Sequence, residues 1–149
     1  MPRTKAKKAT EKPAFLPTMR ELARTYQAFS SYSDSHVRAM GLTSPQFDVL
    51  ATLGGTDGMS MKDLAAATLV TKGTLTGIVD RLEKKELLRR EIPPENRRSF
   101  TIVLTDAGEA LFEKVFPEHI AHLQQRFEKL TTEELQQLQG LLKKLRSQF

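Results

Sequence analysis

The sequence of 149 residues contains no cysteine. This absence excludes disulfides, thiolate nucleophiles, thiol redox sensing and zinc sites built from cysteine. The sequence also lacks the glycine patterns of a Walker loop and of a dinucleotide-binding turn, and no Ser or Thr can be paired from the pattern with one of the three histidines. We therefore expect no enzymatic activity and no cofactor. The sequence supports only one enzymatic hypothesis, metal-assisted hydrolysis at His119 and His122.

Long apolar runs are missing as well. No segment approaches the stretch of about 18 apolar residues that indicates a membrane-spanning helix. The basic start of the chain leads into residues 13–17 (PAFLP) instead of the apolar core of a secretory signal. We expect neither a membrane span nor secretion, and we place the protein in the cytoplasm.

Positive charge is concentrated at the N-terminus. The formal net charge is +5, and residues 1–13 alone hold five Lys or Arg against one Glu. These residues have no apolar pattern, so they are predicted to form a disordered basic arm. Basic segments attract polyanions, of which nucleic acid is the commonest. For the arm alone, a solvated tail that keeps the protein soluble is an equal alternative.

Both flanks of the chain carry apolar residues every three or four positions. This spacing runs through residues 15–29, 112–130 and 135–149 and predicts long helices with narrow apolar seams. Pro117 is expected to kink the second of them. Three seams offer more apolar surface than a small domain buries alone, so we expect a homodimer, with a self-contained monomeric bundle as the alternative. Residues 14–149 then form a single domain, with dimerisation helices at 14–40 and 105–149.

Residues 42–104 carry signals for shorter elements. A capping box at residues 43–46 (TSPQ) opens one helix, and Ser60 and Thr71 cap two more. The period then changes to two over residues 87–92 and 100–104, which predicts a hairpin around the basic turn 93–99. The predicted fold is mainly α with a small β-hairpin wing: a winged helix-turn-helix at 42–104 flanked by long helices.

The helix of residues 71–85 (TKGTLTGIVDRLEKK) contains two glycines, each of which costs about 1 kcal/mol relative to Ala in a helix interior. Its apolar residues form one face, and Gly73 and Gly77 point away from that face. The second helix of a helix-turn-helix ordinarily lies in the DNA major groove, where a backbone without side chains can approach closely. On this outward surface we expect phosphate and base contacts from Lys72, Thr74, Thr76 and Arg81, and backbone contacts from Lys84, Arg89 and Arg90. Thr71 is expected to act mainly as a cap, and Asp80 to pair with a nearby Arg or Lys.

The order of the elements and their motifs resembles the MarR family of bacterial winged-helix transcription regulators. Glu86 is a departure, because the family usually has Gly after the two lysines. The resemblance is carried by Leu42-Thr43-x-x-Gln46, Lys62-Asp63-Leu64-Ala65, residues 71–76 (TKGTLT), residues 79–85 (VDRLEKK), residues 94–98 (PENRR) and Leu104-Thr105-x-x-Gly108.

This resemblance implies a sequence-specific regulator that binds double-stranded DNA as a homodimer on a palindromic operator, most often as a ligand-responsive repressor. It also implies that the wing residues Arg97 and Arg98 reach the minor groove, where arginine reads groove width and potential. The competing interpretation is a winged-helix module for protein–protein contacts, without specific DNA binding.

Family analogy further suggests a small aromatic or phenolic effector in a crevice beside the dimerisation helices. Residues expected to line it are Tyr26, Tyr32, His36, Phe47 and Phe112. Some relatives sense metal ions, and His119 and His122 lie at i, i+3 on one helix face, with His36 able to approach. Ordinary surface histidines are the favoured interpretation, so we predict no metal site.

Overall fold

The computed structural model describes residues 12–95 and 99–149. The chain divides into two compact units, Met1–Tyr32 and Ser33–Phe149. The described part of the first unit is dominated by helix α1 (Leu16–Ala39), whose last residues, from Ser33 onward, belong to the second unit. The predicted apolar seam of this helix is exposed along its length at Phe15, Met19, Leu22, Tyr26 and Phe29.

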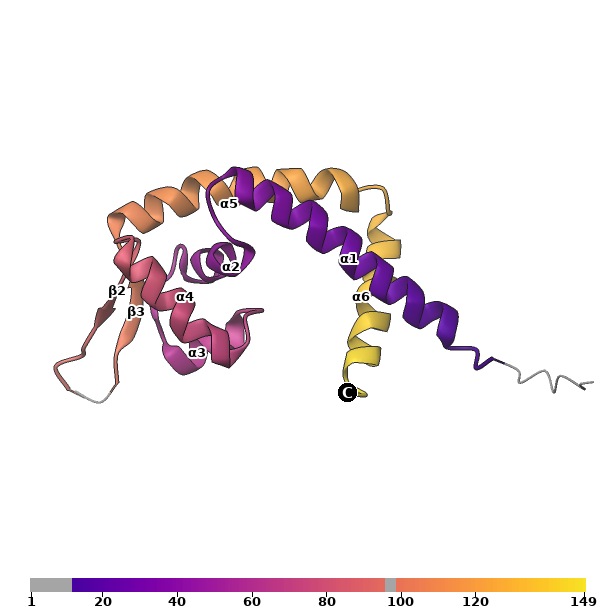
Figure 1. Cartoon of the computed structure of the whole chain (residues 1–149), viewed down its shortest axis with the longest axis horizontal. Coiled ribbons are helices and arrows are strands. Elements are labelled where there is room, and N and C mark those ends of the chain that lie inside the picture. Colours follow the sequence, from indigo (N-terminus) through magenta and orange to yellow (C-terminus); the bar gives the residue numbers. More distant parts are fainter. Residues whose placement is uncertain (1–11, 96–98) are drawn as a thin grey trace, which may run out of the picture. The chain divides into compact units, whose positions relative to one another are not determined.

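The second unit contains the elements predicted for a winged helix and one more strand. After the end of α1 come α2 (Ser44–Leu53), β1 (Met59–Ser60), α3 (Met61–Ala67), α4 (Lys72–Lys84), β2 (Leu88–Glu91), β3 (Thr101–Leu104), α5 (Asp106–Phe127) and α6 (Thr132–Arg146) (Figure 1). The mainly helical fold with a small sheet is confirmed. Helix α5 continues through Pro117, where the sequence predicts a kink.

Four of the helices begin at hydroxyl caps, among them the predicted caps at Thr43 and Ser60. Thr43 and Gln46 form a reciprocal capping box at α2, and Thr131 forms the same arrangement with Glu134 at α6. The Ser60 hydroxyl accepts the N–H of Asp63, and the Thr105 hydroxyl accepts that of Gly108. These bonds satisfy backbone donors that the first helical turn leaves without a partner.

The sheet has three antiparallel strands in the order β1-β3-β2, whereas the sequence predicts only the hairpin of β2 and β3. Strand β1 pairs Met59 with Ile102. Gly58 precedes it at φ +106°, and a Cβ there would lie 2.8 Å from the backbone oxygen of Ile102. A two-residue strand is too short to produce an alternating pattern, which is why the sequence does not reveal it.

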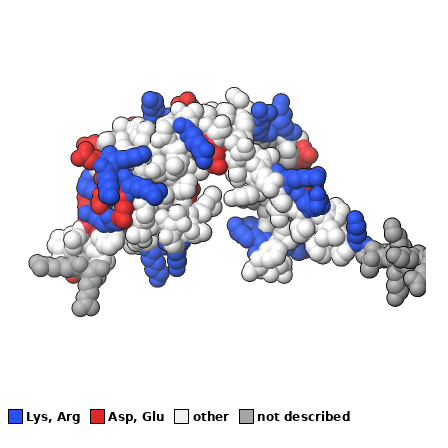
Figure 2. Space-filling view, in the orientation of Figure 1, with Lys and Arg blue, Asp and Glu red and all other residues white. Residues whose placement is uncertain are grey.

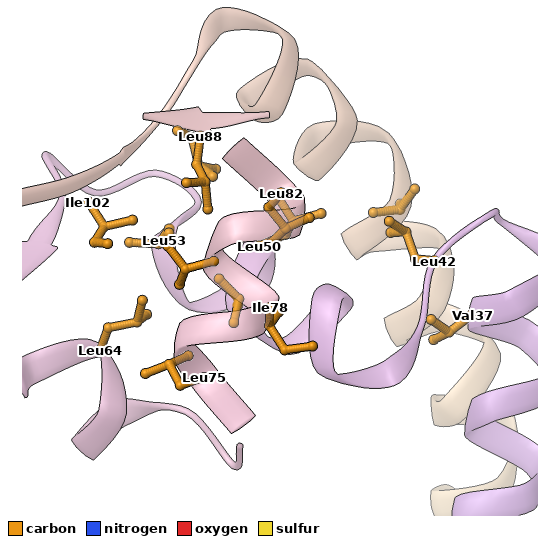
Figure 3. Close-up of a cluster of buried hydrophobic side chains, with 14 residues drawn as sticks. Val37, Leu42, Leu50, Leu53, Leu64, Leu75, Ile78, Leu82, Leu88 and Ile102 are labelled. Atoms are coloured by element: carbon orange, nitrogen blue, oxygen red, sulfur yellow. The ribbon is translucent and has the colours of Figure 1, made fainter. Parts of the chain in front are cut away.

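The core of the second unit lies between α2, α3, α4 and the sheet. Leu50 and Leu53 of α2, Leu75 and Leu82 of α4, and Ile102 of β3 are fully buried in one cluster. Figure 3 shows these side chains converging from separate elements. In the described ranges, no helix is both long and apolar enough to cross a membrane.

Candidate nucleic-acid interface

Helix α4 presents its apolar face inward, as predicted. Leu75, Ile78, Val79 and Leu82 are all at most 4% exposed. Thr71 occupies the N-cap position, but its side chain makes no capping bond to the backbone. Its hydroxyl lies 3.1 Å from the Thr74 hydroxyl instead, so the prediction of a side-chain cap at Thr71 is wrong although the position is right.

The outward face of α4 is bare at both glycines. A Cβ built at Gly73 or Gly77 would have no heavy atom within 4 Å, apart from the helix's own backbone and chain neighbours. Thr74, Thr76 and Arg81 are exposed on the same helix. The structure therefore leaves room for a partner to approach the backbone at these two positions.

A shallow groove lies between α3 and the start of α4. It has a volume of about 250 Å³, and its lining consists of Met61, Lys62, Ala65, Lys72, Leu75 and Thr76. Figure 2 shows cationic side chains at the lower edge of this part of the molecule, where Figure 1 places α3 and the first turn of α4. Within the described residues, neither Lys72 nor Arg81 is paired with a carboxylate.

Arg90 of β2 is held by two carboxylates of α4. Its Nη2 lies 2.5 Å from Asp80 Oδ1 and its Nη1 lies 2.6 Å from Glu83 Oε1. The hydrogen bond from Arg90 to Asp80 raises the pKa of the guanidinium above its usual value. This group of three residues, the Arg90 clamp, agrees with the prediction that Asp80 pairs with a nearby cation.

The remaining cationic candidates differ in their surroundings. Arg89 donates to Glu91 at 2.7 Å in an exposed pair, and Lys84 lies exposed in the last turn of α4. Strands β2 and β3 carry the wing, and its tip residues Arg97 and Arg98 lie outside the described residues. The same holds for residues 1–11 of the predicted basic arm.

The turn before α4 is tied to α2. The Leu69 N–H donates to Asp48 Oδ2 at 2.7 Å, while the Leu69 side chain is 92% exposed. Burial raises the pKa of Asp48, and the hydrogen bond from Leu69 opposes that effect. The sequence offered no sign of this contact because its partner is a backbone group 21 residues away.

The three histidines gather where the end of α1 meets α5. His36 and His119 turn their Nδ1 atoms toward each other at 2.8 Å, and Ser33 Oγ lies 3.1 Å from His119 Nε2. The His36 and His122 rings stack with centroids 3.9 Å apart. Burial lowers the pKa of His119, which is 2% exposed, and the neighbouring His36 and His122 lower it further. The central position of His119 was not predicted, since helical spacing marked it as a surface residue.

Three of the five effector-site candidates lie near this cluster. Phe47 contacts the His119 ring edge-on at 4.6 Å between centroids, and Phe112 stacks with Phe116 at 5.1 Å. His36 belongs to the cluster itself, whereas Tyr26 and Tyr32 belong to the first compact unit. In the part of the chain that the structure describes, no group of three or more His, Cys, Asp or Glu side chains could hold a metal ion.

Comparisons with known proteins show which family the chain resembles in sequence and fold. The model of the MarR family matches residues 42–100. The HTH-type transcriptional regulator MhqR of Bacillus subtilis is 30% identical over 124 residues, which cover 83% of this chain and 86% of that protein.

Two solved structures are similar over most of their length. AbsC, a MarR family transcriptional regulator from Streptomyces coelicolor, has a TM-score of 0.81 and 30% identity and covers 89% of this chain and 91% of its own. BpsR of Bordetella bronchiseptica, whose DNA binding is regulated by 6-hydroxynicotinic acid, has a TM-score of 0.79 and 28% identity over 91% of this chain and 96% of its own. With its winged helix and these relatives, the chain belongs to the MarR family of DNA-binding transcription regulators and is not an enzyme.

Proposed function

We propose that the protein is a ligand-responsive repressor that binds a palindromic operator as a homodimer. The observation that carries the proposal is the outward face of α4, which combines two open glycine positions with Lys72 and Arg81, cations that pair with no carboxylate among the described residues. A helix backbone can approach groove walls closely where side chains are absent, and lysine and arginine neutralise phosphates.

In the proposed complex, α4 lies in the major groove. Thr71 to Thr76 at its N-terminal end meet base edges and phosphates, with Gly77 and Arg81 one turn further on. Arg97 and Arg98 reach the adjacent minor groove, and Lys84 and Arg89 contact the DNA backbone. Arg89 must exchange its pairing with Glu91 for a phosphate to do so.

The apolar seams support the proposed homodimer. In the first unit, Phe15 and Tyr26 are 60% and 69% exposed. In the second, Leu138, Leu142 and Leu145 of α6 form an exposed row at spacings of four and three. Exposed apolar surface of this extent on neighbouring turns is typical of an interaction surface. A two-fold dimer would present two copies of α4 to successive major grooves about one helical turn apart.

We further propose a small aromatic acid or phenol as the effector, bound against His36, Phe47 and Phe112. Aromatic rings in edge-on and stacked contacts, together with imidazole nitrogens, suit a planar ligand with a polar substituent. The regulation of BpsR by 6-hydroxynicotinic acid supports an effector of this class. A ligand that prefers one arrangement of the dimer would shift the population away from the DNA-binding form.

The first test measures binding to the DNA upstream of the protein's own gene by fluorescence anisotropy. Wild-type protein should bind selectively over random duplex, and log K should fall against log salt with a slope of about −0.9 per phosphate neutralised. Gly77→Glu should abolish binding without unfolding the dimer, because it places a carboxylate on the open face. Gly77→Ala is the matched control: it should fold with about 1 kcal/mol more stability and lose far less affinity.

The wing and the effector are tested in the same assay. Arg98→Ala should weaken operator binding and flatten the salt slope. Benzoate and phenol, as probes, should release the wild-type protein from DNA but act less on Phe47→Ala. Selective binding that survives both Gly77→Glu and Arg98→Ala would contradict the proposed surface.

A further inference from the structure

The Arg90 clamp joins the two elements that are proposed to meet DNA. Arg90 lies on β2, the first strand of the wing, and Asp80 and Glu83 lie at i, i+3 on α4. Side chains at that spacing share one face of a helix. Each guanidinium branch is therefore engaged by a different carboxylate, at 2.5 and 2.6 Å. Figure 2 shows basic and acidic side chains intermixed where Figure 1 places α4 and β2.

The same guanidinium also contacts the second arm of the wing. Its central carbon lies 5.5 Å from the centroid of the Phe100 ring, within the range of a cation–π contact. Phe100 directly precedes β3 and packs against the hydrophobic core. One side chain thus links α4 and both sides of the wing hairpin.

The guanidinium of the Arg90 clamp is better shielded than that of the neighbouring Arg89. The Arg90 side chain is 25% exposed and that of Arg89 55%, while Asp80 and Glu83 (51% and 40%) are about as exposed as Glu91 (50%). Less exposed pairs are screened less by solvent and salt. Arg90 would have to break both carboxylate contacts to reach a phosphate, while Arg89 would have to break only one, more exposed contact.

We propose that Arg90 is a positioning residue for DNA binding: it fixes the wing hairpin relative to α4 and acts on DNA through the wing, not by contacting phosphate. This inference rests on the proposed function, and it replaces the sequence-based expectation that Arg90 contacts the DNA backbone. It makes Asp80 and Glu83 necessary for binding although both carry the charge that DNA repels.

The first test compares Arg90→Lys with Arg90→Gln on an operator selected from random duplexes. Lysine keeps the positive charge but cannot bond both carboxylates with a planar fork. We expect the affinity of both variants for the operator to fall about fivefold to tenfold. A loss of this size is typical when charge-assisted hydrogen bonds are removed in partly exposed surroundings. Near-wild-type binding by Arg90→Lys alone would identify Arg90 as a phosphate contact and overturn the inference.

The second test uses the sign of a charge change. Asp80→Asn and Glu83→Gln each remove a negative charge, which by electrostatics alone raises affinity for DNA. We expect both to lower operator affinity by about the same factor as Arg90→Gln, because they open the clamp. Glu91→Gln is the matched control. It removes a carboxylate that lies on β2, the strand of Arg90, but outside the clamp, and the affinity of this variant for the operator should stay the same or rise. A rise in all three variants would overturn the inference.

The third test asks whether the effect passes through the wing. In the background of Arg97→Ala with Arg98→Ala, Arg90→Gln should cost less than twofold more, since the wing contact is already lost. If Arg90→Gln lowers the affinity by the same factor in this background as in the wild type, Arg90 does not act through the wing. Urea unfolding of every variant separates misfolding from misplacement. Failure of the wild-type protein to select any duplex would overturn the proposed function itself, a result distinct from these three.

Discussion

At the scale of single residues, Glu86 adopts a backbone conformation that is unfavourable for a residue with a side chain. It is the one non-glycine residue with positive φ, at 59°, among the residues that the structure describes. The left-handed region costs a residue with a Cβ about 1 kcal/mol or more. The Thr105 hydroxyl donates to the Glu86 carbonyl, which helps to hold this conformation. The backbone conformation at this position therefore favours glycine, the residue that the family usually has there.

Replacing Glu86 by Gly should stabilise the protein. The gain should be roughly 0.5–1 kcal/mol, because relief of the strained backbone outweighs the greater freedom of glycine in the unfolded chain. Urea unfolding at neutral pH measures the change. The neighbouring Lys85 has φ −81°, so Lys85→Gly is the control and should destabilise. Equal effects of the two substitutions would show that strain at residue 86 is not the cause.

The buried His119 should make stability depend on pH. Its pKa is lowered in the folded protein by burial first and then by His36 and His122. The unfolded chain takes up a proton near pH 6.5, and the folded chain does so only at lower pH. Stability should therefore be constant above about pH 7 and fall as pH decreases through 6.5, by at most about 1.4 kcal/mol per pH unit for this group.

Unfolding in urea between pH 7.5 and 5 checks this expectation. His119→Gln removes the titrating group, so its stability should change less with pH than that of the wild type. The pKa of the neighbouring His122 is also lowered, first by desolvation, then by His36, and last by Arg126 on the same helix. An identical pH profile for His119→Gln and the wild type would assign the dependence to other groups.

At the scale of elements, the position of α4 depends on contacts that have no periodic signature. Asp48 accepts the Leu69 N–H across 21 residues of sequence and so fixes the turn that leads into α4. Burial raises the pKa of this carboxyl, which means that its charged form is disfavoured in the folded state. The hydrogen bond needs an acceptor oxygen, but it does not need a charge.

We therefore expect Asp48→Asn to be as stable as the wild type at pH 7 or up to about 1 kcal/mol more stable, since the amide keeps the acceptor without the buried charge. Because the folded state favours the protonated carboxyl, the wild type should lose stability as the pH rises through the raised pKa of Asp48, and Asp48→Asn should not. Asp48→Ala should lose about 1 kcal/mol, because the Leu69 N–H is left without its partner. Thermal unfolding at pH 4 and pH 7 distinguishes these outcomes. An alanine variant more stable than the asparagine variant would contradict the argument.

The sequence predicted most of the elements because their signals are local. The capping box at Thr43 and the apolar spacing of α4 depend on residues within one or two turns of each other. Strand β1 was missed because a two-residue strand has no pattern, and its pairing with β3 is long-range. The position of His119 and the second carboxylate of the Arg90 clamp were missed for the same reason. Both arise where separate elements meet.

At the scale of the whole molecule, the exposed apolar rows are the feature that a single chain does not explain. Leu142 is 42% exposed on α6, with Leu138 and Leu145 beside it at helical spacing. Charge placed in such a row should oppose association. Leu142→Glu is expected to dissociate the dimer at micromolar concentration, to remove the concentration dependence of thermal unfolding and to lower operator affinity.

Light scattering after size exclusion measures the mass of each variant. Gln136→Glu adds the same charge elsewhere on α6, at an exposed polar residue, and should remain dimeric. A wild-type protein that is monomeric at all concentrations would refute the proposed homodimer. The proposed wing contacts could then still be tested on a single half-site.

The pairing of β1 with β3 turns the stretch from Met59 to Ile102 into a closed loop that contains α3, α4 and β2. Closing a loop of this length carries an entropy penalty that is recovered only when the enclosed elements pack together. The helix-turn-helix and the wing should therefore form and melt as one cooperative unit, with uniform protection of their amide hydrogens from exchange. A protease cut inside the loop would release both halves from this shared constraint.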